Sequence, residues 1–188
     1  MKVFLNPGHA PNGIPDPGAK NAETGLRECD VAKHIADLVE KYLTAAGVEV
    51  VGNIQSDNLF YDSDYPQPCV CSEANASGAD IFVSIHCNAF DYAAHGTETY
   101  AYAPGGEGEK LAGCINDQIV KSLGTLDRGV KYRPDYIVLK HTDMTAVLVE
   151  TAFIDSDIDE PLLREQQDDF ARAIARGVTD YEQILAQR

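Results

Sequence analysis

The chain has 188 residues, of which 44% are hydrophobic, and it carries a formal net charge of −15 at pH 7. A chain of this length and composition buries one sizeable core, which excludes global disorder and favours a single domain. The negative charge disfavours a nucleic-acid partner because it repels phosphate backbones. No apolar run approaches the roughly 20 residues of a membrane-spanning helix, so we expect no membrane insertion.

The first residues, MKVFLNPGH, contain one lysine and a short apolar run. That run is shorter than the core of a secretory signal peptide. We therefore expect that the chain is either synthesised without a signal peptide or is a processed form.

Hydrophobic periodicity predicts that strands alternate with helices along the whole chain. The predicted elements are, in chain order, a strand at 2–6, a loop at 10–25, a helix at 27–46, a strand at 48–53, a short helix at 68–78, strands at 80–88 and 96–102, a helix at 107–122, strands at 135–140 and 145–151, and helical structure at 160–185. This alternation is typical of an α/β fold with a mostly parallel, twisted sheet and helices on both faces. Neither a linker nor an internal repeat interrupts it, so we treat residues 1–188 as one domain.

Three of the predicted strands are apolar until they end in one polar residue. The first strand leads into His9, the strand at 80–88 contains His86, and the strand at 145–151 contains Glu150. In open parallel sheets the ligand crevice lies at the carboxyl ends of the strands. We therefore expect these three side chains to point into one shared region.

A fourth candidate, Glu28, lies at the start of the helix at 27–46. At roughly 100° per residue, Glu28 falls only about 30° from the centre of the helix's apolar arc. A carboxylate on a buried helix face is costly unless it is paired or binds a metal, although the first turn of a helix also favours negative charge. Glu23, in the preceding loop, is the alternative ligand, but no rigid element holds it.

Two histidines and one carboxylate on rigid elements form the donor set of a catalytic Zn²⁺ site with one open position. Such a metal would polarise a bound carbonyl and lower the pKa of a water molecule. The reaction would also need a base, and Glu150 is the candidate because its apolar neighbours would raise its pKa. The sequence thus predicts His9, Glu28 and His86 as ligands and Glu150 as the catalytic residue.

The remaining histidines and the five cysteines carry weaker signals. His34 lies at the edge of the apolar arc, and His95 and His141 lie in predicted loops, with His141 closest to the predicted crevice. The odd number of cysteines argues against a disulfide framework. We interpret them as buried or incidental thiols, and a metal cluster of Cys69, Cys71 and Cys87 is the alternative.

Six segments of the chain resemble the zinc-dependent N-acetylmuramoyl-L-alanine amidases of the amidase type 3 catalytic family. They are LNPGH at 5–9, GLRE at 25–28, ANASGADIFVSIHCNA at 74–89, GTETY at 96–100, RGVK at 128–131 and AVLVETAFIDSDID at 146–159. Their order and spacing span the chain from the first strand to the last helix. The resemblance implies that His9, Glu28 and His86 are the zinc ligands and that Glu150 is the catalytic glutamate.

The resemblance also implies a substrate. These enzymes cleave the amide between the lactyl group of N-acetylmuramic acid and the L-alanine of the peptidoglycan stem peptide. We accordingly expect a catalytic amidase domain without a wall-binding module, acting as a monomer on the peptidoglycan of the bacterial cell wall. A phage lysin, a sporulation or cell-separation enzyme and a prophage amidase all fit these features.

Two other functions fit the same residues. A zinc peptidase that cleaves at a carboxyl terminus would need a cation to hold the substrate carboxylate, and Arg128, Lys131 and Arg133 are the candidates. A non-catalytic wall-binding protein on an amidase fold would not need an intact ligand set.

Overall fold

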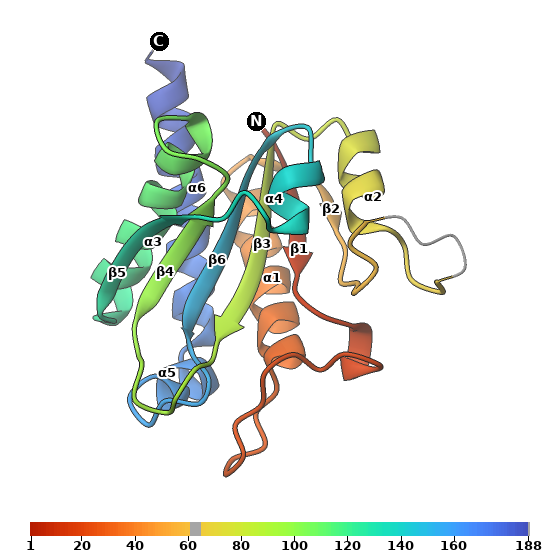
Figure 1. Ribbon diagram of the computed structural model, residues 1–188. Helices are drawn as coiled ribbons and strands as arrows, with labels where there is room; N and C mark the ends of the chain where they lie inside the picture. The colour runs from red at the N-terminus through yellow and green to blue at the C-terminus, as the bar shows by residue number, and fades with distance from the viewer. Residues whose placement is uncertain (61–64, 188) are drawn as a thin grey trace.

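Six strands form one twisted sheet in the computed structural model, which describes residues 1–60 and 65–187 (Figure 1). The strand order is β2-β1-β3-β6-β4-β5. From β2 to β6 the neighbours are parallel, whereas β4 is antiparallel to β6 and parallel to β5, so the predicted mostly parallel sheet is confirmed. The bounds are β1 Lys2–Pro7, β2 Glu49–Asn53, β3 Ile81–Asn88, β4 Thr97–Ala101, β5 Asp127–Tyr132 and β6 Thr145–Phe153.

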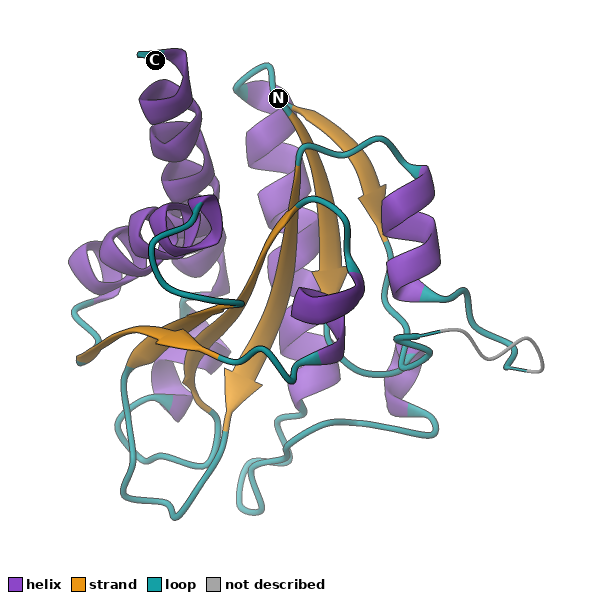
Figure 2. Ribbon diagram, turned by 45° about the horizontal axis from the view of Figure 1, so that its top comes forward, coloured by secondary structure: helices purple, strands orange, loops and turns teal. Residues whose placement is uncertain are grey.

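Helices cover both faces of the sheet, as the sequence predicts (Figure 2). On one face α6 packs against both α1 and α3, and the short helices α2 and α4 lie on the other face. None of the described helices is long and apolar enough to cross a membrane. The bounds are η1 Pro11–Gly13, α1 Glu28–Ala45, α2 Val70–Ala76, α3 Glu107–Leu123, α4 Ile137–His141, α5 Glu160–Glu165 and α6 Gln167–Ala186.

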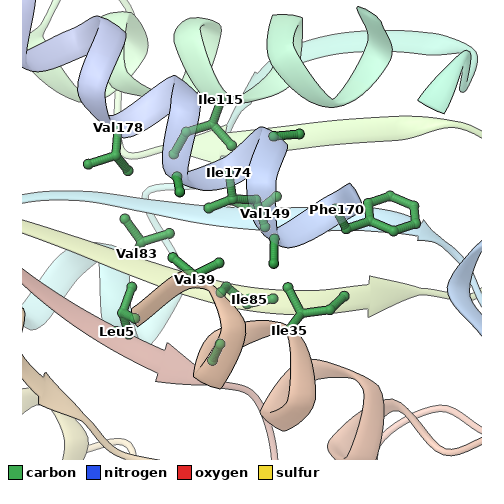
Figure 3. Packing of buried hydrophobic residues seen from close by; sticks show 14 of the residues in the cluster. Leu5, Ile35, Val39, Val83, Ile85, Ile115, Val149, Phe170, Ile174 and Val178 are labelled. Atoms are coloured by element: carbon green, nitrogen blue, oxygen red, sulfur yellow. The ribbon is translucent and has the colours of Figure 1, made fainter. Parts of the chain in front are cut away.

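The larger hydrophobic core lies between the sheet and the three long helices (Figure 3). Alternate strand residues reach opposite faces, so Leu5 and Val83 enter this core while Phe4 and Phe82 stack at 5.8 Å in the smaller core under α2 and α4. Because both faces are buried, the central strands are mainly apolar, and the buried Ser84 hydroxyl within β3 donates to Asn6 Oδ1 of β1 at 2.8 Å.

Two elements near residue 130 differ from the prediction. The apolar run at 135–140 forms a helix, α4, rather than a strand, because Val138 and Leu139 are both buried in the smaller core. A short apolar run does not distinguish the two conformations by periodicity. The strand β5 was not predicted, because it is a charged edge strand interrupted by Gly129 at φ +73°. The helical stretch at 160–185 is confirmed but divides at Gln166 into α5 and α6.

Candidate metal centre

The three polar strand ends meet because their strands are adjacent. β3 lies between β1 and β6 and is parallel to both, so their carboxyl ends lie along one edge of the sheet. His9 follows β1 in the loop, His86 is near the end of β3, and Glu150 of β6 is the register partner of His86. The predicted shared region therefore exists.

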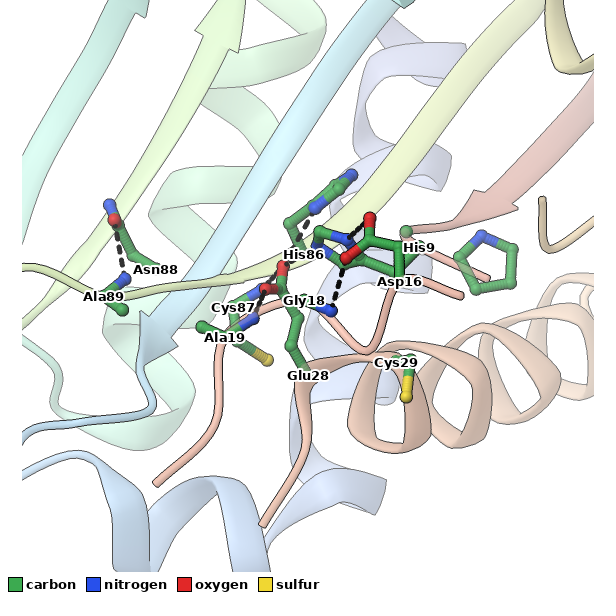
Figure 4. Close-up of polar contacts among 12 residues, drawn as sticks. His9, Asp16, Gly18, Ala19, Glu28, Cys29, His86, Cys87, Asn88 and Ala89 are labelled. Atoms are coloured by element: carbon green, nitrogen blue, oxygen red, sulfur yellow. Dashed lines mark hydrogen bonds and ion pairs between the residues drawn. The ribbon is translucent and has the colours of Figure 1, made fainter. Parts of the chain in front are cut away.

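Glu28 completes a cluster with the two histidines (Figure 4). One ligand atom from each of His9, Glu28 and His86 lies within 4.8 Å of the others. Glu28 Oε1 is 2.9 Å from His9 Nε2 and 2.9 Å from His86 Nδ1. Within residues 1–60 and 65–187, this is the one group of three or more histidine, cysteine or acidic side chains placed to share a metal ion.

Glu23, the alternative ligand, lies outside this cluster. Its backbone N–H donates to Asn21 Oδ1 in a turn of the loop, and the residue is exposed. The helix start, rather than the loop, therefore supplies the carboxylate that meets the histidines.

Glu28 is only 4% exposed, and hydrogen bonds hold both oxygens of its buried carboxylate in place. Its Oε2 accepts the Ala19 N–H at 2.8 Å, and its Oε1 accepts the Cys87 N–H at 3.0 Å. Burial alone would raise the pKa of Glu28, but its contacts with His86 and His9 outweigh burial and hold the pKa well below the ordinary value. The carboxylate is therefore ionised and competent to bind a cation.

His9 is oriented by a residue that sequence reasoning missed, Asp16. The Asp16 Oδ2 lies 2.7 Å from His9 Nδ1, and its Oδ1 accepts the Gly18 N–H at 2.9 Å. Burial lowers the pKa of His9, but its contacts with Glu28 and Asp16 raise it to about 9. A carboxylate on one ring nitrogen directs the other nitrogen toward a metal. The only sequence signal was an acidic residue between Pro15 and Pro17 in the loop after His9.

The donor atoms fit a zinc ion. His9 Nε2 is buried and lies beside Glu28 without a hydrogen bond of proper geometry. Two imidazoles and a carboxylate match the ligands that Zn²⁺ takes in catalytic sites, where a fourth position stays open. The residues present therefore suit this metal, with His9 Nδ1 committed to Asp16.

Glu150 lies beside the cluster in different surroundings. It faces a pocket of about 390 Å³ whose walls are mainly apolar, formed by Leu59, His86, Asp135, Tyr136, Ile137, Val138, Leu148 and Glu150 itself. Its Oε2 is buried and has no hydrogen-bond partner among residues 1–60 and 65–187. Burial, together with the charges of Glu28 and Glu98, raises the pKa of Glu150 well above the ordinary value. A carboxyl group with a raised pKa is suited to accept and return a proton.

The other predicted candidates lie apart from this centre. His34 contacts Gln167 on the surface, His95 contacts the Ala93 carbonyl, and His141 stacks on Phe60 with 4.0 Å between ring centroids.

The alternative cysteine cluster is wrong. Cys71 is buried in the smaller core, while Cys87 is buried in the larger core on the other side of the sheet. In the described part of the chain, none of the five cysteines forms a disulfide and none belongs to a metal-competent group.

Comparison with known proteins places this chain in one family. The family model described as N-acetylmuramoyl-L-alanine amidase matches residues 3–180. The chain is 38% identical over 184 residues to the N-acetylmuramoyl-L-alanine amidase LytC of Bacillus subtilis, covering 95% of this chain and 35% of LytC. It is 35% identical over 185 residues to the endolysin of Bacillus phage SPP1, covering 93% of this chain and 62% of the endolysin.

A solved structure gives the same result. The N-acetylmuramoyl-L-alanine amidase AmiC2 of Nostoc punctiforme superposes with a TM-score of 0.83 at 31% identity, and the match covers 97% of each chain. The chain therefore spans nearly all of the AmiC2 chain but only about one third of LytC and about two thirds of the SPP1 endolysin.

Proposed function

This chain belongs to the N-acetylmuramoyl-L-alanine amidase family, and we propose that it hydrolyses the amide between the lactyl group of N-acetylmuramic acid and the L-alanine of the peptidoglycan stem peptide. The observation that carries the proposal is the convergence of His9, Glu28 and His86 within 4.8 Å, next to a buried and unsatisfied Glu150. The site of action is the peptidoglycan of the bacterial cell wall.

In this proposal Zn²⁺ is held by His9 Nε2, the Glu28 carboxylate and His86. When bound, the metal supplies a Lewis acid for the scissile carbonyl and for the attacking water. Asp16 keeps His9 in the tautomer that leaves Nε2 free, and the backbone N–H groups of Ala19 and Cys87 fix Glu28.

Glu150 moves the proton. Its Oε2 accepts a proton from the attacking water, since no donor from the described residues occupies that atom. The same carboxyl group then donates the proton to the nitrogen of the departing L-alanine, which leaves as a neutral amine. The raised pKa of Glu150 suits both steps, because such a carboxyl group takes up a proton more readily than an ordinary glutamate.

The test is digestion of purified peptidoglycan with and without a chelator, followed by identification of new amino termini. We expect L-alanine as the new terminus, loss of activity on chelation, recovery on adding Zn²⁺, and one zinc per chain by mass spectrometry. Release of free amino acids from the carboxyl terminus would instead indicate a peptidase. Binding to peptidoglycan without cleavage would indicate a wall-binding protein, and full activity of the metal-free chain would exclude the zinc site.

A further inference from the structure

A second buried carboxylate, Glu98, lies beside Glu150 and has no part in the proposed chemistry. Glu98 is on β4, is 2% exposed, and is the direct register partner of Glu150 across the antiparallel β4–β6 pair. Directly opposed residues of such a pair project from the same face of the sheet. The two side chains are therefore neighbours at the edge of the catalytic pocket.

Four donors converge on the two oxygens of Glu98. Its Oε1 accepts Asn88 Nδ2 at 2.9 Å and the Tyr100 hydroxyl at 2.5 Å. Its Oε2 accepts Arg128 Nε at 2.6 Å and Lys131 Nζ at 2.5 Å. A buried carboxylate with this many partners is a fixed structural anion, and what it fixes is a pair of cations from the edge strand β5.

The charges of this group do not cancel. Two cations meet one carboxylate, which leaves an excess positive charge in a chain whose formal net charge is −15. The side chains of Arg128 and Lys131 remain 29% and 38% exposed. Arg128 is further held by the His95 carbonyl at 3.4 Å and by the Phe153 ring at 4.9 Å.

Donors are left over on both cations. Within the described residues, Glu98 and the His95 carbonyl engage Nε and Nη1 of Arg128, and Glu98 engages one proton of Lys131 Nζ. Arg128 Nη2 and two Nζ protons can therefore meet a ligand. This fork of N–H donors, held in place and reaching solvent, is the arrangement that recognises a carboxylate.

The substrate has its carboxylates on one side of the scissile bond. The lactyl carboxyl group of N-acetylmuramic acid is consumed in the amide, so negative charge lies in the stem peptide. We propose that Arg128 and Lys131, positioned by Glu98, bind a carboxylate of the stem peptide and so set the substrate preference of this amidase domain. This inference rests on the proposed function, and it places the peptide over β4 and β5 while the apolar pocket lies on the α4 side of Glu150.

The experiment compares two muramoyl-peptides with the zinc-loaded protein, one with free carboxyl groups and one with every carboxyl group converted to an amide. We expect a KM about tenfold lower for the free acid, a difference that weakens with added salt. The Lys131→Met and Arg128→Gln variants should lose this preference through KM, with kcat changed less than twofold. The matched control is Lys121→Met, which removes the same charge from an exposed position on α3.

Two further measurements keep the outcomes distinct. If Lys131→Met does not fold, the double variant Glu98→Gln/Lys131→Met removes the opposed charges together and should still lose the preference. Equal KM values for both substrates in the wild type, or an equal rise for both in Lys131→Met, would overturn the inference. Cleavage of neither substrate would contradict the proposed function instead. In that case calorimetry with the free stem peptide would test this inference without turnover. We expect the acid form to bind more tightly than the amide form, and equal affinities would overturn the inference.

Discussion

Glu98 and Glu150 are adjacent on one face of the sheet, but their surroundings are opposite. Glu98 receives four donors, and although burial raises its pKa, the contacts with Lys131, Tyr100 and Arg128 bring the pKa below the ordinary value. Glu150 has a buried oxygen that no described residue donates to, and its pKa is well above the ordinary value. The same residue type is therefore a structural anion in one place and, in the proposed function, a proton carrier in the other, according to which hydrogen bonds the fold provides.

The largest effect should come from removing the unsatisfied carboxylate. Glu150→Gln keeps the shape of the side chain but not its basicity, so kcat should fall by about 10²- to 10⁴-fold. Zinc content and the near-wild-type fold should persist, as measured by mass spectrometry and circular dichroism. Turnover of muramoyl-peptide at the wild-type rate would show that Glu150 is not the base.

The two ring nitrogens of His9 differ in the same way. Nδ1 shares a hydrogen bond with Asp16, whereas Nε2 has no hydrogen-bond partner among the described residues. Asp16→Asn should weaken zinc binding by about 10- to 100-fold, because the amide no longer fixes the ring through a charged contact. Competition with a zinc chelator measures the change. Asp30→Asn is the control, since Asp30 pairs with Arg27 on the exposed side of α1, and an equal loss there would point to a general charge effect.

The pKa of His9 makes zinc binding dependent on pH. Below about pH 9 the metal must displace the His9 proton, so affinity should rise about tenfold between pH 7 and pH 8. The stability of the metal-free protein should depend on pH in the opposite direction from the zinc affinity. The contacts of protonated His9 stabilise the fold fully below pH 6.5, the ordinary pKa of histidine, and this stabilisation is lost as the pH rises through the folded pKa of about 9. Calorimetry in buffers of different ionisation enthalpy should detect release of about one proton at pH 7, and a pH-independent affinity would contradict the prediction.

The two glutamates should also have opposite effects on stability in the metal-free protein. Because the folded pKa of Glu150 is raised, its ionisation costs stability above about pH 4.5, so Glu150→Gln should stabilise the fold by about 1 kcal/mol at pH 7 and not at pH 4. Because the folded pKa of Glu98 is lowered, it contributes stability above that pH, so Glu98→Gln should cost about 1–2 kcal/mol at pH 7. That cost should shrink as pH falls through the folded pKa. Urea unfolding at pH 4 and pH 7 measures both stability changes. If both substitutions stabilised the fold at pH 7, or both destabilised it, the two glutamates would not differ in the way described.

Two glycines of the loop before α1 share a backbone conformation but differ in their surroundings. Gly18 and Gly25 have left-handed φ values of +67° and +77°, but a Cβ on Gly18 would lie 2.5 Å from His9 Cδ2, while one on Gly25 meets nothing within 4 Å. Gly25→Ala should cost about 1 kcal/mol of unfolding free energy, and Gly18→Ala about 2–3 kcal/mol together with weaker zinc binding. Thermal unfolding with and without Zn²⁺ separates the two, and equal effects would mean that the loop adjusts to the added methyl group.

The sequence predicted the convergence of His9, Glu28 and His86 because strong patterns position these side chains. The strands before His9, around His86 and before Glu150 are apolar runs, and the helix of Glu28 has a clear apolar face. These patterns place the polar residues in one region only if the strands are neighbours, and the strand order that makes them so comes from the structure.

The parts that escaped prediction depend on how distant segments meet. The contact between Asp16 and His9 requires the particular path of the loop that joins them, including left-handed Asn12. The position of Glu98 beside Glu150 requires β4 to insert antiparallel next to β6, which no local pattern reveals. The edge strand β5, with its two cations, has no apolar repeat to mark it.

The backbone of His9 itself adopts a left-handed conformation, with φ +68°. For a residue with a Cβ this conformation costs about 1–2 kcal/mol, which the neighbouring contacts must offset. Gln55 contributes by donating to the carbonyls of Gly8 and Cys29, which ties the loop to the start of α1. Without a cation to hold its ring, this segment would be among the first to open, and a protease should cut a chelated sample there before it attacks the rest of the domain.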